Sequence, residues 1–172
     1  FDVRGENVKS VAERPSWYEV TLKPDKSRAG RSAVYRGDIN GRFSIENLNA
    51  NQTLLQCDYA KVLFSILQEM PLEDEDVYVF GELSDWQIKP EFKMEYSYEA
   101  HAYVCEAWLK QGFYNYEYRV VNRHTGKVDD EGFEGNWYET PNKYTILIYF
   151  RPFGARYERL MGAATVDSKF RQ

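Results

Sequence analysis

The sequence has few cysteines and no long hydrophobic run, and each scarcity excludes a class of protein. Cys57 and Cys105 are its two cysteines, too few for the disulfide framework of a small secreted domain. Both lie in apolar, strand-like stretches, which favours two buried free thiols. A bridge between them is the alternative, and it would indicate an oxidising compartment. No apolar run approaches the roughly 20 residues of a membrane-spanning helix, so we expect no membrane insertion.

Positive charge and catalytic motifs are also scarce. The formal net charge is -5, so the chain lacks the basic footprint of a nucleic-acid-binding protein. Two histidines without a Cys-x-x-Cys pair give little support to a zinc site, and the acidic clusters lack EF-hand spacing. No set of nucleophile, base and orienting group can be recognised. We therefore expect no nucleic acid, no metal, no cofactor and no enzymatic activity.

Aromatic residues, by contrast, are abundant and point to β-structure. They make up 16% of the chain, with 14 Tyr and 10 Phe, and such side chains favour strands. Strand-like segments separated by turns follow one another at 77–81, 101–109, 113–121 and 143–151, a spacing typical of a sandwich. The apolar run 57–67 fits either a buried helix or a strand, and its β-branched and aromatic content favours a strand.

Two segments predict which side chains face the core. FYNYEYRVV at 113–121 alternates, with Tyr114, Tyr116 and Tyr118 on one face, which we expect to be buried. TILIYF at 145–150 is apolar on both faces, which predicts a central strand covered on both sides.

The N-terminal region predicts two further strands, at 8–13 and 17–22, followed by a polar loop at 25–32. We therefore divide the chain into N-terminal strands at 1–30, one interpretation of which is the end of a preceding β domain, and a sandwich at 31–172. Asn40-Gly41 is a candidate hairpin turn. Because the chain begins with Phe and has no signal peptide, we expect a fragment or a processed form.

VYVFGELSDW at 77–86 and KQGFYNYEYRVV at 110–121 are similar in order and spacing to the starch- and glycogen-binding modules of branching enzymes and of the AMP-activated protein kinase beta subunit. The resemblance implies an immunoglobulin-like β-sandwich of the early-set kind, here with extra N-terminal strands. It also implies that Trp86 stacks on glucose, with Trp137 as a possible second platform. The position of the family's sugar-contacting lysine is occupied by Glu117, so we expect Trp86 to be structural and sugar binding to be absent.

Longer blocks, among them CDYAKVLFSI at 57–66, PLEDEDVYVFGELSDWQ at 71–87 and EGNWYETPNKYTILIYFRPFGARYERLMG at 134–162, resemble the C-terminal portion of the type IX secretion system plug protein of Bacteroidetes-type bacteria. Trp137 departs from the His or Phe expected there. The resemblance implies a periplasmic, outer-membrane-associated protein without enzymatic activity that closes the inner mouth of a large translocon barrel. A carbohydrate-binding module of the starch- or glycogen-binding kind is the alternative.

The block around residue 153 has two interpretations. In one, Arg151, Phe153, Arg156 and Tyr157 form a docking surface for the barrel. In the other, 152–154 is a turn, and Arg156 and Tyr157 belong to a terminal strand packed on the sandwich.

Overall fold

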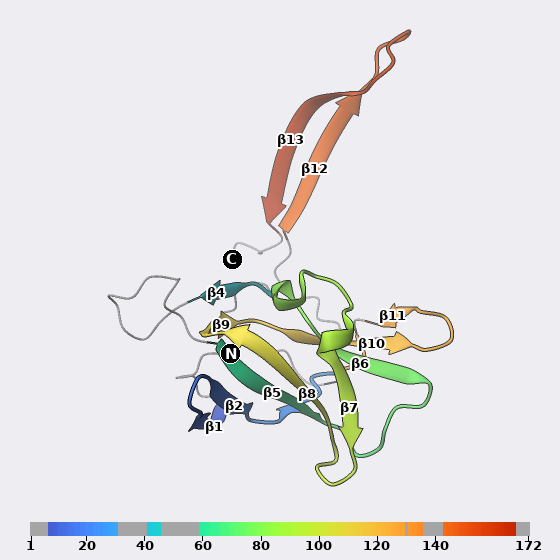
Figure 1. Cartoon of the computed structure of the whole chain (residues 1–172). Coiled ribbons are helices and arrows are strands. Elements are labelled where there is room, and N and C mark those ends of the chain that lie inside the picture. Colours follow the sequence, from blue (N-terminus) through green and yellow to red (C-terminus); the bar gives the residue numbers. More distant parts are fainter. Residues whose placement is uncertain (1–6, 31–40, 46–58, 130, 136–142, 168–172) are drawn as a thin grey trace, which may run out of the picture. The chain divides into compact units, whose positions relative to one another are not determined.

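The chain is an all-β protein in its computed structural model, which describes residues 7–30, 41–45, 59–129, 131–135 and 143–167 (Figure 1). It divides into two compact units, Phe1–Asn136 and Trp137–Gln172. Two short 3-10 turns, η2 (Glu82–Ser84) and η3 (Pro90–Phe92), interrupt the strands. The strands are β1 (Val8–Glu13), β2 (Tyr18–Leu22), β3 (Asp25–Lys26), β4 (Phe43–Ile45), β5 (Tyr59–Leu67), β6 (Glu75–Phe80), β7 (Lys93–Ser97), β8 (Ala102–Lys110), β9 (Gly112–Tyr114), β10 (Glu117–Asn122), β11 (Val128–Asp129), β12 (Lys143–Phe150) and β13 (Arg159–Asp167).

The first unit is a sandwich whose two layers share one strand. One layer has the order β1-β2-β5-β8-β7, with β3 also paired to β5, and the other has the order β7-β6-β10-β11. Strand β7 belongs to both layers, because Lys93 and Met94 pair with β6 whereas the segment from Glu95 pairs with β8. A strand that changes sheets in this way forms a corner of a sandwich. Strands β4 and β9 form a separate two-stranded sheet.

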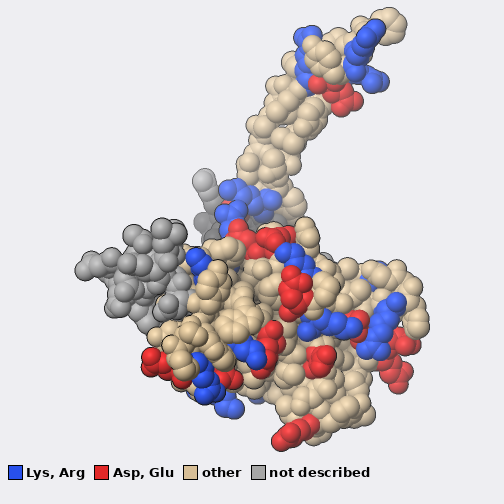
Figure 2. All heavy atoms as spheres, in the orientation of Figure 1, with Lys and Arg blue, Asp and Glu red and all other residues tan. Residues whose placement is uncertain are grey.

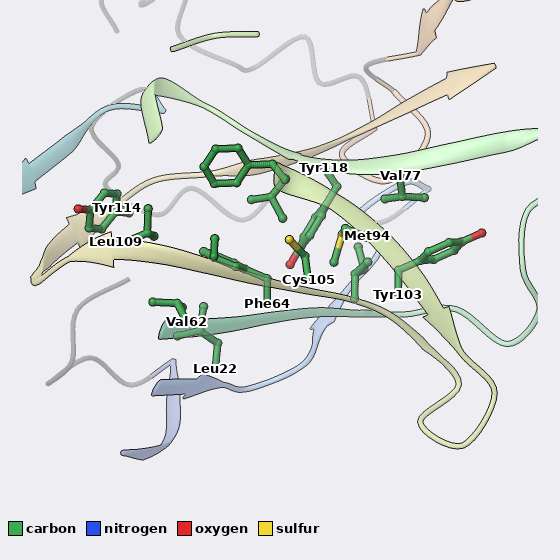
Figure 3. Close-up of a cluster of buried hydrophobic side chains, with 14 of the residues drawn as sticks. Leu22, Val62, Phe64, Val77, Met94, Tyr103, Cys105, Leu109, Tyr114 and Tyr118 are labelled. Carbon is green, nitrogen blue, oxygen red and sulfur yellow. The ribbon is translucent and has the colours of Figure 1, made fainter. Parts of the chain in front are cut away.

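The hydrophobic core lies between these layers and follows from the alternation of each strand. In β5, every second residue from Ala60 to Ile66 is buried, and in β8 every second residue from Tyr103 to Leu109 is buried. The side chain of Tyr118 reaches from the opposite layer toward Phe64 and Cys105 (Figure 3). The fully buried hydrophobic side chains are Val20, Leu22, Val62, Phe64, Ile66, Val77 and Val79.

A partly buried carboxylate joins the two layers. The hydroxyls of Tyr116 and Tyr118 both donate to Asp25 Oδ2, at 2.8 and 2.7 Å. Burial, reinforced by the negative charge of Asp25, raises the pKa of both tyrosine hydroxyls well above 10. Both hydroxyls therefore remain protonated hydrogen-bond donors at neutral pH.

Most of the strands expected from the sequence are present. The predictions for 8–13, 17–22 and 57–67 are confirmed by β1, β2 and β5. The burial of one face at 113–121 is also confirmed, since Tyr114 and Tyr118 are buried. That segment forms two strands rather than one, because the Asn115 amide donates to the Arg42 carbonyl at 2.9 Å. Strand β9 therefore pairs with β4, and β10 pairs with β6.

The prediction of a central strand at 145–150 is wrong. Within the described residues β12 pairs with β13 alone, and all eight of its residues are exposed. The boundary between the two units follows Asn136, whereas the sequence interpretation divided the chain at residue 30. Strand β2 pairs in parallel with β5 and therefore belongs to the sandwich. Asn40 lies outside the described residues, and Gly41, at φ +72°, leads into β4.

Asp76 ties β6 to the elements on both sides. Its carboxylate accepts hydrogen bonds from Lys93 of β7 at 2.7 Å and from Arg123, which follows β10, at 2.8 Å. Partial burial opposes ionisation, but these two hydrogen bonds outweigh it, and the pKa of Asp76 lies below its usual value of 3.8. The ionised carboxylate therefore stabilises the folded state.

We predict that Asp76→Asn lowers the free energy of unfolding at pH 7 by about 1 kcal/mol, since it weakens two charge-assisted hydrogen bonds. Because the folded pKa is lowered, the difference from the native chain should persist above 3.8 and vanish as the pH falls through the folded pKa. Urea unfolding at pH 7, 5 and 3 measures it, with the exposed Glu99→Gln as control. A difference that does not change with pH would contradict this assignment.

Candidate functional site

The β12–β13 hairpin exposes apolar side chains on both of its faces. Successive residues of a strand point to opposite faces, and the neighbours Leu147 and Ile148 are 48% and 59% exposed. Side chains on both faces of the ribbon are therefore exposed among the described residues. The large apolar side chains exposed along it are Tyr144, Ile146, Leu147, Ile148, Tyr149, Phe150, Leu160, Met161 and Val166.

The two strands of the hairpin differ in side-chain size. Ile146 lies opposite Ala164, and Ile148 lies opposite Gly162. A Cβ built on Gly162 would meet only the Ile148 side chain, at 4.0 Å, so the surface above this glycine is open. The large side chains of β12 therefore project further from the ribbon than the small side chains of Gly162 and Ala164 in β13. The register shifts between Ile148 and Tyr149, and such a bulge increases the local twist of a ribbon.

A tight turn closes the hairpin and displays one aromatic ring. The Ala155 amide donates to the Pro152 carbonyl at 3.0 Å, and Gly154 has φ +80°. A positive φ at the third position defines a type II turn and favours glycine there. The second position is occupied by Phe153, whose side chain is fully exposed. The turn therefore holds a phenyl ring in solvent at the end of the hairpin.

Charged residues are confined to the two ends of the hairpin. Lys143 and Asp167 pair at the open end, and the residues near the turn include Arg151, Arg156 and Arg159. The Arg159 guanidinium lies 5.6 Å from the centre of the Tyr157 ring. Figure 2 shows the uncharged stem and the charged turn end.

This surface has the properties of a binding element. An isolated two-stranded ribbon is at best marginally stable in water, and a contiguous exposed apolar patch with a polar rim marks an interaction site. The four residues predicted as partner contacts, Arg151, Phe153, Arg156 and Tyr157, all lie in the turn end, between β12 and β13. The turn at 152–154 is confirmed. The packing of Arg156 and Tyr157 in a terminal strand is wrong, because both precede β13 and Tyr157 is exposed.

The stem residues of the hairpin were missed as a functional surface. The sequence interpretation assigned Ile146 and Ile148 to a buried strand. The available signal was the second apolar run, Leu160 to Val166, which follows the turn and matches the first run in length. Two such runs around a Pro-x-Gly turn indicate a hairpin.

The second candidate site, at Trp86, lies at one end of the sandwich. Asp85 and Trp86 both have left-handed backbone conformations, with φ of +55° and +57°, which cost about 1 kcal/mol or more each. Hydrogen bonds hold this strained turn in place: the Trp86 amide donates to the Gly81 carbonyl at 3.0 Å, as does the hydroxyl of the buried Ser84. The backbone at Trp86 is therefore fixed by its own loop.

The indole of Trp86 packs on one side and is half-exposed on the other. Its ring meets Phe80 edge to face at 5.9 Å, and a Cβ on Gly41 would lie 2.5 Å from it. Glu117, at the position where the resemblance implies a sugar-contacting lysine, accepts a hydrogen bond from Arg119 at 2.8 Å. Trp137 lies outside the described residues, so no second aromatic platform is placed beside Trp86.

Cysteine and metal chemistry add no further site among the described residues. Cys105 is a free, buried thiol whose pKa is raised by burial to about 11; Cys57 lies outside the described residues. No cluster of three metal-ligating side chains occurs in the part of the chain that the structure describes. The same part holds no helix long and apolar enough to cross a membrane.

We predict that a chain ending at Asn136 still unfolds cooperatively, because every buried hydrophobic residue that the structure describes lies between Val20 and Phe133. Its melting temperature should stay within about 4 °C of the full chain, the shift that roughly 1 kcal/mol produces. Calorimetry measures this. Phe64→Ala, a core truncation expected to cost about 3 to 5 kcal/mol, is the control. Loss of the cooperative transition on truncation would show that the sandwich depends on the hairpin.

Comparison with known proteins identifies a solved relative. No family model and no curated protein matches the chain. A crystal structure of a hypothetical protein from Parabacteroides merdae ATCC 43184, at 2.30 Å resolution, is similar to it with a TM-score of 0.82 and 37% sequence identity. The match covers 95% of this chain and 41% of that protein, so the chain spans less than half the length of its relative.

Proposed function

We propose that this chain is a non-enzymatic, periplasmic binding module that closes the inner mouth of the outer-membrane barrel of a type IX translocon. The observation that carries the proposal is the β12–β13 hairpin, with both apolar faces exposed. The ordered sequence blocks shared with the plug proteins support it. The solved relative comes from a bacterium of the Bacteroidetes, the group in which those plug proteins occur.

The hairpin suits a partner that surrounds it. A flat docking surface covers one face of a ribbon, but here Leu147 and Ile148 project from opposite faces and are both exposed. The outer edge of each strand can also add to a partner sheet by backbone hydrogen bonds. A barrel built of strands offers walls and edges on more than one side, and it can cover both faces together.

The sandwich surface suits a contact that forms and releases. In Figure 2, acidic and basic side chains are interspersed on the visible face of the first unit. Polar interfaces of this kind are typical of complexes that exchange partners. We therefore assign tight anchoring to the hairpin and reversible contacts to the sandwich.

We predict that deleting the gene leaves secretion possible but makes the outer membrane leaky to molecules that it normally retains. Supplying the complete protein should reseal the membrane, and the protein should copurify with a large barrel. The Ile148→Glu variant should fail in both assays, because it places a charge on one covered face of the hairpin. Tyr98→Glu, at an exposed turn of the sandwich, is the matched control. Unchanged permeability after deletion, together with no accompanying barrel, would refute the assignment.

Sugar binding is the second candidate, and one observation favours it: Trp86 leaves 48% of its surface exposed. Against it, Glu117 is engaged by Arg119 and supplies no cationic donor. Sugar sites combine an aromatic face with polar groups that bind hydroxyls, and the charged neighbours of Trp86 in sequence, Asp85 and Lys89, pair with each other. We therefore assign Trp86 a structural role.

We predict that maltoheptaose and glycogen produce no saturable change in tryptophan fluorescence. Trp86→Ala should lower the free energy of unfolding by about 2 kcal/mol, roughly half the cost of removing a fully buried Trp, because half of the ring is exposed. Since the chain has four Trp, Trp86→Phe is the spectral control. A saturable response that disappears in Trp86→Phe would restore the sugar hypothesis.

A further inference from the structure

The turn end of the hairpin carries a net positive charge, opposite in sign to the net charge of the whole chain. The whole protein has a formal net charge of -5. From residue 151 to residue 159 there are three arginines, Arg151, Arg156 and Arg159, against the single acid Glu158, which gives a local charge of +2. No acidic residue occurs between Lys143 and Tyr157. We call residues 151–159 the hairpin tip.

The hairpin tip combines this charge with a protruding apolar anchor. The type II turn places Phe153 at its outermost corner, fully exposed. Phe150, Tyr157 and Leu160 are each more than half exposed beside it. Aromatic rings next to arginines are the composition of segments that lie at a membrane interface, where rings enter the headgroup layer and cations meet lipid phosphates.

The distribution of apolar groups around the tip favours a lipid layer over a flat protein surface as its ligand. Tyr149 pairs with Leu160 and shares a face with it, whereas Phe150, the next residue of the strand, points to the opposite face; all three are exposed. A flat protein surface would cover one side of this group. A headgroup layer surrounds an inserted tip on every side, so it can contact the apolar groups on both faces of the hairpin.

Backbone chemistry limits how deep the hairpin tip can go. Next to the tip, β12 and β13 pair only with each other among the described residues, so the outer edge of each strand is open there, and open sheet edges do not occur within the hydrocarbon region of a bilayer. Insertion therefore stops at the headgroup level. The stem stays outside the hydrocarbon, while the long arginine side chains extend to phosphates around the turn.

We infer that the hairpin tip binds the surface of an anionic phospholipid membrane, with Phe153 inserted among the headgroups and Arg151, Arg156 and Arg159 on lipid phosphates. This site goes beyond the proposed pore closure and does not depend on it. If both hold, the membrane leaflet that borders the barrel is the natural ligand, and the same hairpin contacts barrel and lipid.

The test is flotation of the purified full chain with vesicles of phosphatidylglycerol and phosphatidylethanolamine, compared with phosphatidylcholine alone. We expect binding to the anionic vesicles that weakens with salt. Phe153→Ser should weaken binding at least tenfold, from the lost burial of the ring. Arg156→Gln should weaken it about fivefold, the contribution of one basic residue near an anionic surface. Tyr98→Ser, at an exposed aromatic of the sandwich, should leave binding unchanged.

A positional probe complements flotation. In Phe153→Trp the added emission should shift to shorter wavelength with anionic vesicles, whereas Tyr98→Trp should show no shift. Absence of vesicle binding at low salt, or binding unaffected by Phe153→Ser, would overturn the inference. A chain that copurifies with the barrel but ignores vesicles would overturn it while leaving the proposed function intact. Vesicle binding without any barrel would support the lipid site and count against pore closure.

Discussion

The fold of the first unit depends on one carboxylate placed between two layers. Asp25 belongs to β3, which pairs with β5, yet it receives the hydroxyls of Tyr116 and Tyr118 from the opposite layer. A buried polar group without partners is costly, so β3, β5 and β10 are held in one arrangement. The adjacent segment extends the link, because the amides of Arg28 and Ala29 both donate to the Phe133 carbonyl. Residues 25–29 thus take part in strand pairing, in the hydrogen bonds between the layers and in the closure of the sandwich.

This arrangement leaves the hairpin with a different task. The buried core described for the first unit consists of that unit's own residues and includes none of the apolar residues of β12. They remain exposed, at a cost in solubility, and such a cost is typical of surfaces that serve binding. The buried core and the exposed apolar surface therefore lie in two different segments of the chain, the sandwich and the ribbon.

The sequence predicted the sandwich well where one face of a strand is buried and the other is wet. Alternation located β1, β2 and the buried tyrosines, whereas β-branched and aromatic content favoured the strand at β5. It failed at 145–150, because a strand apolar on both faces has the same pattern whether two layers cover it or none does. The parallel pairing of β2 with β5 could not be predicted from the sequence either, since it joins segments that are distant along the chain. At the candidate site, the Pro-x-Gly pattern located the turn at 152–154, whereas the exposure of the stem could be seen only in the structure.

The unprotected edges of the ribbon have a consequence for how copies of the chain associate with one another. Natural strands at sheet edges usually carry lysine, proline or inward charges that block pairing with other chains. The segments 144–150 and 160–166 contain no charged residue and no proline. Two copies of the chain therefore present matching surfaces for edge-to-edge assembly.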